Sequence, residues 1–247
     1  MSKFSIRGSK PVAMVTGGAS FLGRAISLKL ALEGYDLILH YQKSLDKTKK
    51  LADEARLLGA VVLLIKADLR KVDGLSALVQ SPIRRFNRLD LLVNNASLFF
   101  PTPLSNNRLS QWRELFQVNL FSPYFLVKAV APWLRKTRGC VVNLTDIYGE
   151  NPILKNYSGY SASKAGLISV TKSLAGELGP LIRINAISPG AIFIPENYKD
   201  KQKKALIERS ALKRQGTPED IADAVHFLAT QKFVTGQVLR VDGGRFL

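Results

Sequence analysis

Tyr160 and Lys164 are the first residues in this sequence whose types and spacing suggest chemistry. The segment NYSGYSASKAG, residues 156–166, has a helical pattern, so side chains four residues apart emerge on one face about a turn apart. An ammonium group beside a phenol favours the phenolate, so we expect Lys164 to lower the pKa of Tyr160 from roughly 10. Taken alone, such a pair is more often a surface contact. Acid catalysis therefore needs support from the rest of the chain.

Asp146 is a second candidate because it ends a run of strand-forming residues, VVNLTDIYG at 141–149. An unpaired charge inside a sheet is expensive, so the carboxyl group requires a chemical reason. When ionised, it repels a ketone oxygen but accepts from N–H donors; when protonated, it donates to a ring nitrogen. A flat, nitrogen-bearing substrate fits Asp146 better than a keto-acyl chain does.

A glycine-rich segment, TGGASFLGRA at 16–25, follows the first apolar run. Glycines at such a strand-to-helix junction allow a sharp turn and aim helix N-terminal N–H groups at an anion. This pattern predicts a dinucleotide phosphate loop, against the alternative of a merely structural turn. The predicted contacts in this loop are Gly17, Ser20, Phe21, Leu22 and Gly23.

The turn after the second strand, HYQKS at 40–44, indicates which dinucleotide is preferred. Chains that bind NAD place an acidic residue roughly 20 residues beyond the glycines, where it meets the ribose 2′-hydroxyl. Here no carboxylate repels a 2′-phosphate, and Lys43 and Ser44 can hold one, with Tyr41 and Gln42 beside them. The sequence favours NADPH; the alternative is that Lys43 merely begins an exposed helix.

Two adjacent aromatic residues follow the fourth strand, in NNASLFFPTPL at 94–104. Flat heteroaromatic rings stack on such side chains, with about 0.5–1.5 kcal/mol beyond area burial. We therefore expect Phe99 to sandwich a planar substrate against the nicotinamide. The alternative is that Phe99 and Phe100 anchor the loop in the core.

Short apolar runs alternate with longer helical patterns along the whole chain. Most of the runs are too continuously apolar for a one-sided sheet, which predicts a parallel sheet of about seven strands with helices on both faces. The fold class is therefore α/β, a single doubly wound, Rossmann-like domain spanning 1–247. The predicted strands are 12–15, 36–40, 61–66, 89–94, 140–145, 182–188 and 237–241, and the predicted helices are 23–33, 46–58, 110–135, 157–178 and 218–229. The insertion at 189–217, rich in Lys and Pro, is predicted to cover the substrate.

The chain carries 36 Lys and Arg against 19 Asp and Glu, a net charge of +17. The positive residues cluster at 43–50, 84–88 and 199–214 without interleaved aromatics, so we expect solvated faces that attract anionic ligands, with no nucleic-acid partner.

The apolar runs are too short for a membrane span and no signal peptide is evident, which predicts a cytoplasmic protein. The single Cys140 is expected to be a buried, unreactive side chain. No metal site is expected.

Taken together, these motifs resemble the short-chain dehydrogenase/reductase family. Its Thr-Gly-x-x-x-Gly-x-Gly loop, ADL at 67–69, NNA at 94–96 and Tyr-x-x-x-Lys are all present, except that Phe21 replaces the middle glycine. The resemblance implies that Tyr160 and Lys164 are catalytic and contact the cofactor. It further implies cofactor contacts through Asp68, Leu69, Asn95, Ala96, Pro189, Gly190 and Ile192, and a proton relay to Lys164 supported by Asn119.

Within this family the chain resembles the pteridine reductases. They share NNAS-x-F-x-PTPL, the HY-x-[basic]-S turn, an acid in place of the usual serine, and a C-terminal VTG…VDGG. The resemblance implies NADPH-dependent reduction of a dihydropterin or dihydrofolate to its tetrahydro form by a homotetramer whose interfaces include 157–178. Asp146 joins the catalytic group, Phe99 stacks on the substrate, and Ser97 contacts both cofactor and pterin. Those reductases carry an arginine at position 21, so Phe21 implies a different substrate anchor.

Two alternatives remain open at this stage. One is a different short-chain reductase acting on a carbonyl, such as a 3-oxoacyl thioester. The other is a non-catalytic NADPH-binding sensor, against which the intact Tyr160 and Lys164 argue.

Overall fold

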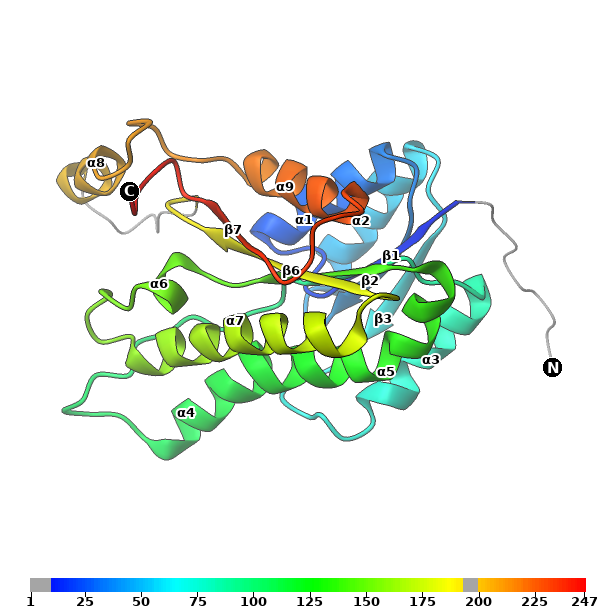
Figure 1. The fold of residues 1–247 in the computed structure, drawn as a ribbon, viewed down its shortest axis with the longest axis horizontal. Coiled ribbons are helices and arrows are strands. Elements are labelled where there is room, and N and C mark those ends of the chain that lie inside the picture. The colour runs from blue at the N-terminus through cyan, green and yellow to red at the C-terminus, as the bar shows by residue number, and fades with distance from the viewer. Residues whose placement is uncertain (1–9, 193–199) are drawn as a thin grey trace.

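A parallel seven-stranded sheet is the centre of the fold (Figure 1). The computed structural model describes residues 10–192 and 200–247. The strands are β1 (Val12–Val15), β2 (Asp36–Tyr41), β3 (Val62–Lys66), β4 (Leu91–Asn94), β5 (Cys140–Leu144), β6 (Arg183–Pro189) and β7 (Val238–Val241). Their spatial order is β3-β2-β1-β4-β5-β6-β7 and every neighbouring pair is parallel. The predicted fold class is confirmed, and the order reverses between β1 and β4, where such sheets form a ligand crevice.

Helices cover both faces of the sheet (Figure 1). One face carries α1 (Phe21–Leu32), α2 (Leu45–Leu57) and α9 (Pro218–Thr230). The other carries α3 (Leu75–Phe86), α4 (Leu109–Phe116), the π-helix η1 (Gln117–Phe121), α5 (Ser122–Thr137) and α7 (Ser158–Leu178). Two further helices, α6 (Ile147–Glu150) and α8 (Asp200–Glu208), lie near the carboxyl ends of the strands.

The buried side chains divide into two clusters because successive residues of a strand point to opposite faces. In β1, Val12 and Met14 pack towards α3, α5 and α7, whereas Ala13 and Val15 pack towards α1, α2 and α9. Both faces of the strands are thus apolar, and this explains the continuous apolar runs in the sequence. Cys140 lies in the second cluster, where burial raises its pKa to about 11, so it is unreactive as expected.

Two predicted segments differ from the structure. The single helix expected over 110–135 is instead α4, η1 and α5 in succession, because a π-turn at 117–121 interrupts the α-helical hydrogen bonding. The 189–217 segment was expected to be irregular, yet it contains α8. Residues 193–199 of that segment lie outside the described residues. Helices α3, α6 and α8 are not among those predicted from the sequence.

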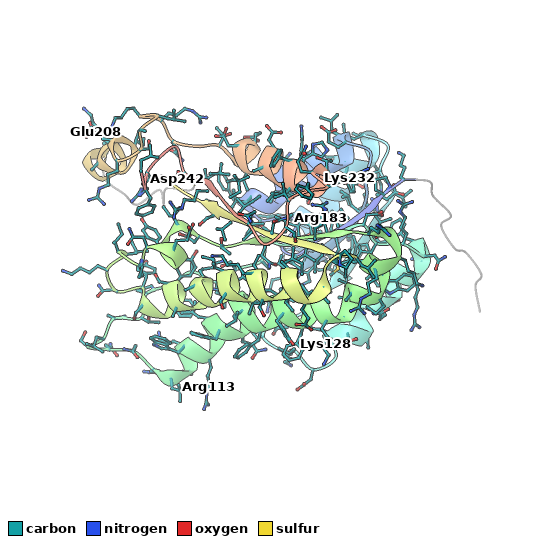
Figure 2. The ribbon with its side chains drawn as sticks, in the orientation of Figure 1. Arg113, Lys128, Arg183, Glu208, Lys232 and Asp242 are labelled. Atoms are coloured by element: carbon teal, nitrogen blue, oxygen red, sulfur yellow. The ribbon has the colours of Figure 1, made fainter. Side chains whose placement is uncertain are left out.

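Positively charged side chains lie on the outer faces of the helices. Figure 2 shows Arg113 on α4 and Lys128 on α5 pointing away from the sheet, and both are exposed. In the predicted clusters, Lys49, Lys50, Arg84 and Arg85 are exposed as well, which agrees with the expectation of solvated faces. No helix in the described part of the chain is long and apolar enough to cross a bilayer.

Candidate active site

The glycine loop between β1 and α1 brings the backbone close to the position of a bound anion. Gly17 has a φ of +61°, a conformation that favours glycine. A Cβ on Gly23 would collide with the carbonyl oxygen of Gly17 and lie 2.8 Å from Asn95 Nδ2. Ser20 caps α1, since its Oγ accepts a 3.2 Å hydrogen bond from the N–H of Gly23. The loop therefore presents the N-terminus of α1 as an anion site.

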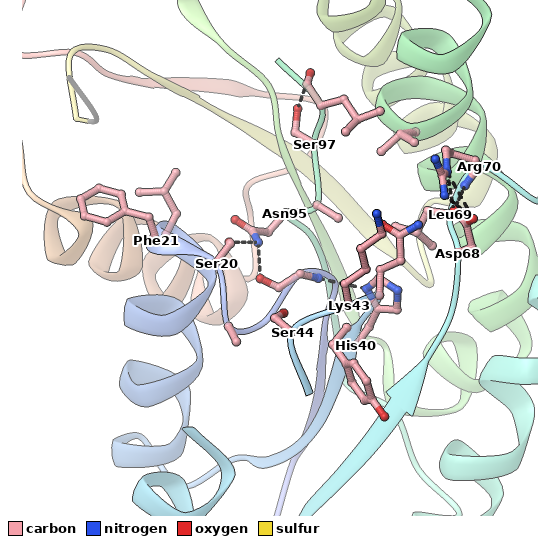
Figure 3. A pocket seen from close by; sticks show the side chains of 18 of the residues that line it. Ser20, Phe21, His40, Lys43, Ser44, Asp68, Leu69, Arg70, Asn95 and Ser97 are labelled. Atoms are coloured by element: carbon pink, nitrogen blue, oxygen red, sulfur yellow. Dashed lines mark hydrogen bonds and ion pairs between the residues drawn. The ribbon is translucent and has the colours of Figure 1, made fainter. Parts of the chain in front are cut away.

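Asn95, at the end of β4, fixes this loop from the other side (Figure 3). Its Nδ2 donates to the carbonyl oxygen of Gly17 and to Ser20 Oγ, each at 3.1 Å. The N–H of Ala96 donates to Thr16 Oγ1 at 3.0 Å. Asn95 and Ala96, both predicted as cofactor contacts, thus also hold the loop in shape.

His40 is a residue of this site that the sequence argument did not include. Its Nδ1 accepts a 3.1 Å hydrogen bond from the N–H of Gly17, so Nε2 carries the proton and donates to the Ala67 carbonyl oxygen at 3.2 Å. Burial lowers the pKa of His40, which keeps the imidazole neutral and preserves both bonds. The imidazole connects the glycine loop to the ends of β2 and β3. The sequence signal that could have identified His40 is its position in HYQKS, directly before the predicted cofactor contacts.

A cleft of about 870 Å³ extends from the glycine loop along the ends of β1, β2 and β4 (Figure 3). Most of the predicted cofactor residues line it: Gly17, Ser20, Phe21, Leu22, Tyr41, Gln42, Lys43, Ser44, Asp68, Leu69, Asn95, Ala96 and Ser97. Lys43 and Ser44 precede α2, which begins only at Leu45, so Lys43 faces the cleft from a turn and does not begin a helix. Lys47, one turn further on, also lines the cleft and was not predicted.

Arg70 occupies the far end of this cleft and was also missed. Its guanidinium makes a bidentate ion pair with Asp68, with Nη2 2.8 Å from Oδ2, and reaches Glu114 on α4 at 3.4 Å. Hydrogen bonding to Arg70 lowers the pKa of Asp68 to about 2. Asp68 is therefore a permanent carboxylate with an internal partner, and its predicted contact with adenine stays a prediction.

Asp146 lies directly beside Tyr160. The carboxylate follows β5 and caps α6, because Oδ1 accepts a 2.8 Å hydrogen bond from the N–H of Tyr148. Oδ2 accepts a 2.7 Å hydrogen bond from the hydroxyl of Tyr160 on α7. β5 and α7 thus bring the two residues together. The carboxyl group at the strand end is not unpaired, because it accepts hydrogen bonds from Tyr148 and Tyr160.

The expected lowering of the Tyr160 pKa below 10 is wrong, because other effects outweigh that of Lys164. Burial, with the adjacent Asp146 as a further cause, raises the pKa of Tyr160 well above 10. Lys164 Nζ lies 5.8 Å from the centroid of the phenol ring and donates instead to the Leu144 carbonyl oxygen at 2.8 Å. Burial also raises the pKa of Asp146 and lowers that of Lys164 to about 8. The nearest charge to the phenol is therefore the carboxylate, and Tyr160 is held as a protonated acid.

Asn119 lies in the π-helix η1, behind the site. Its Oδ1 accepts from the N–H of Leu98 at 2.8 Å and from Ser97 Oγ at 3.1 Å. Its Nδ2 donates to the Leu98 carbonyl oxygen and to Ser163 Oγ, each at 3.0 Å. These four bonds use the whole hydrogen-bonding capacity of the amide. Any support that Asn119 gives to a relay through water must come from its backbone, and that role stays a prediction.

Phe99 lines the catalytic pocket and is 52% exposed, which rules out the reading of this residue as a core anchor. Its ring stacks on Tyr157 with centroids 4.5 Å apart, and meets the ring of Tyr160 edge-on at 4.7 Å. Phe100 is half-buried. Phe99 thus packs against two other aromatic rings at the pocket, and its stacking on a substrate stays a prediction.

The catalytic pocket, of about 490 Å³, joins the cofactor cleft, because Leu22, Asn95 and Ser97 line both. Asp146, Tyr160 and Lys164 face this pocket, as do Pro189, Gly190 and Ile192 from the end of β6. Tyr148 and Arg245 line it too and were not predicted. In the described parts of the chain, no cluster of His, Cys, Asp and Glu could hold a metal ion.

Known proteins resemble this chain over nearly its whole length. A family model described as enoyl-(acyl carrier protein) reductase matches residues 17–245. The 3-oxoacyl-[acyl-carrier-protein] reductase FabG of Staphylococcus epidermidis is 35% identical over 95% of this chain and 98% of that protein. The chain belongs to the short-chain dehydrogenase/reductase family. It is accordingly an oxidoreductase.

Two solved structures show how far the likeness extends. A blue fluorescent protein from a metagenomic library, in complex with NADPH, has a TM-score of 0.90 at 30% identity and covers 98% of this chain and 100% of that one. FolM alternative dihydrofolate reductase 1 from Brucella canis, complexed with NADP, has a TM-score of 0.86 at 30% identity and covers 95% of this chain and 93% of that one.

Proposed function

We propose that this protein is an NADPH-dependent pterin reductase, which converts a dihydropterin or dihydrofolate to its tetrahydro form. The observation that carries the proposal is the 2.7 Å hydrogen bond between Tyr160 and Asp146 in a pocket bordered by Phe99. The B. canis neighbour, named as an alternative dihydrofolate reductase, gives independent support.

NADPH fits the cofactor cleft. The close packing at Gly23, where a Cβ has no room, holds the loop against Asn95, and Gly17 and Ser20 of that loop line the cleft where a pyrophosphate would bind. Lys43, Ser44 and Lys47 provide two positive charges and a hydroxyl for a 2′-phosphate, and HYQKS at 40–44 contains no carboxylate. When bound, NADPH supplies the hydride for the reduction. The two neighbours whose structures contain NADPH or NADP agree with this assignment.

The chain's own residues provide protons and orientation. Tyr160 is the acid for the substrate nitrogen, because its raised pKa keeps the hydroxyl protonated at neutral pH. Asp146 orients the Tyr160 hydroxyl by accepting its 2.7 Å hydrogen bond, and a proton taken up from solvent restores the phenol after turnover. Lys164, with a pKa of about 8, is mostly charged at pH 7 and stabilises the phenolate that Tyr160 leaves behind.

Reduction of a 3-oxoacyl thioester is the rival function, favoured by the S. epidermidis relative. A carbonyl oxygen needs hydrogen-bond donors at the reacting centre. Asp146 is an acceptor when ionised, so of the two groups only Tyr160 could donate to such an oxygen. A nitrogen heterocycle, which offers N–H donors as well as acceptors, suits the pair better.

The discriminating experiment is NADPH oxidation with dihydrobiopterin, dihydrofolate, dihydromonapterin and an acetoacetyl thioester. The Asp146→Ser variant should lose about 100-fold or more of its pterin turnover while its affinity for NADPH stays within a few-fold. The wild-type protein should prefer a pterin to the thioester. Equal pterin turnover by the variant, or a preference for the thioester, would remove the proposal. Tight NADPH binding with no turnover of any substrate would favour the sensor.

The predicted homotetramer is part of the same proposal. Phe121, Tyr124 and Phe125 lie exposed along η1 and α5, beside α7, and such a group of aromatic side chains favours association. Phe125→Glu should lower the mass of the assembly in light scattering, whereas Leu57→Glu, on the exposed side of α2, should not. A native protein that is monomeric at micromolar concentration would contradict this part.

A further inference from the structure

Arg245 brings a positive charge into the catalytic pocket from the C-terminal end of the chain. Its Nη2 donates a 3.1 Å hydrogen bond to Tyr148 Oη, and its Cζ lies 5.8 Å from the centroid of the Tyr148 ring. The pocket thus has Tyr148, Asp146 and Arg245 among its polar lining groups. The proposed proton chemistry uses the carboxylate but gives the guanidinium no role.

The turn that carries Arg245 has a defined geometry. The Asp242 carboxylate accepts hydrogen bonds from the N–H groups of Gly244 at 2.9 Å and Phe246 at 3.3 Å. Gly243 and Gly244 have φ values of +65° and +75°, so both adopt conformations that other residues rarely reach. The glycine turn that follows β7 thus sets the path of the C-terminal residues, and Arg245 among them lines the pocket.

Gly190 secures this turn from the cofactor side. A Cβ on Gly190 would lie 2.5 Å from the Cα of Asp242, so the end of β6 packs directly on the turn. The position of Arg245 thus depends on packing between the ends of β6 and β7, of which the end of β6 borders the pocket. Arg245 is part of the pocket's wall.

Arg245 and Asp146 together favour a substrate ring with a particular arrangement of polar atoms along one edge. A guanidinium only donates hydrogen bonds, in a planar fork, and so selects an oxygen acceptor. Asp146 and Tyr160 meet the nitrogen that is protonated. In a 7,8-dihydropterin, the ring oxo oxygen and the nitrogen of the reducible C=N bond lie side by side on one edge. Electrostatics agrees with this proximity, because Arg245 is among the groups that lower the pKa of Asp146 against the larger effect of burial.

We propose that Arg245 is a specificity-determining residue that binds the ring oxo oxygen of the substrate, next to the nitrogen protonated by Tyr160. The inference rests on the proposed pterin reduction and deepens it. It also assigns a substrate anchor to a chain whose position 21 is Phe. The C-terminal turn thereby selects 4-oxo pteridines over rings that lack the oxygen.

The test compares two ligands that differ at this one ring position. Binding of pterin, which has the 4-oxo group, and of 2,4-diaminopteridine, which has an amino group there, is measured by calorimetry on the NADPH-loaded protein. Arg245→Met should weaken pterin binding about tenfold or more and change 2,4-diaminopteridine binding less than about threefold. The KM for dihydrobiopterin should also rise in Arg245→Met. Arg245→Lys, which keeps the charge without the fork, should recover part of the loss.

Arg135→Met, on the exposed end of α5, is the matched control and should bind both rings as the native protein does. Unchanged NADPH affinity and melting temperature show that Arg245→Met is folded. Equal weakening of both rings, or of neither, overturns the role of Arg245 while pterin reduction stands. A native protein that neither binds nor reduces any pteridine overturns the proposed function and this inference together.

Discussion

The two ends of the active site are constructed differently. The cofactor cleft is wide, and its charged groups, such as the ion pair of Asp68 and Arg70, are partly or fully exposed. The catalytic pocket is smaller, and its ionisable groups, Asp146, Tyr160 and Lys164, are buried together. In the cleft, hydrogen bonding to Arg70 is the largest cause of the shift in the Asp68 pKa, and burial is the largest cause only for the deeper His40; in the pocket, burial is the largest cause for all three groups.

This difference assigns cofactor binding to the cleft and proton transfer to the catalytic pocket. Exposed charges can recognise an anion with little cost, since water screens and solvates them. Buried groups have strongly shifted pKa values, as proton transfer near neutral pH requires. Changes in the cleft should therefore alter cofactor affinity and choice, and changes in the pocket should alter turnover.

The largest expected effect is that of Tyr160→Phe. Removing the hydroxyl takes away the acid and leaves Asp146 without its 2.7 Å partner, so kcat for dihydrobiopterin should fall about 100- to 10,000-fold. NADPH affinity, measured by fluorescence titration, should stay within a few-fold. Tyr157→Phe, which keeps the ring stacked on Phe99, is the control. If Tyr160→Phe lost NADPH affinity by as large a factor as kcat, the cleft and the pocket would not have the separate roles of cofactor binding and proton transfer.

An intermediate effect is expected from Lys43→Met combined with Lys47→Met. Both lysines line the cleft and are exposed, so each bond to a phosphate should contribute about 0.7–1.4 kcal/mol. The KM for NADPH should rise roughly 10- to 100-fold, with kcat and the KM for NADH nearly unchanged. The exposed pair Lys49 and Lys50, replaced in the same way, serves as the control. An equal rise for both nucleotides would mean that these lysines do not read the 2′-phosphate.

The smallest effect is a pH dependence. Burial lowers the pKa of Lys164 to about 8, so its ammonium is charged below this pH and neutral above it. Because the charge stabilises the phenolate of Tyr160, kcat/KM should fall about tenfold per pH unit above pH 8, whereas NADPH affinity should change much less. Stopped-flow measurement of NADPH oxidation between pH 6 and 10 checks this. A flat profile up to pH 10 would show that Lys164 is not needed as a cation.

Local patterns were sufficient for most of the fold and for the cofactor cleft. The alternation of apolar strands and helices, the glycine spacing and HYQKS each act within a few residues, so the sequence alone places Lys43 and Ser44 at the cleft. The π-turn around Asn119 has no local signature of this kind. Its presence depends on packing against α7 and the segment that follows β4.

The sequence by itself determined the parallel sheet, the phosphate loop and the identity of the reactive residues, because periodicity and glycine geometry are local properties. Tertiary structure decided the pKa values of those residues and the groups that surround them. Burial reversed the expected shift in the pKa of Tyr160, and His40, Arg70 and Arg245 entered the site from distant segments. Desolvation and charge proximity depend on which segments pack together, and spacing along the chain does not record that.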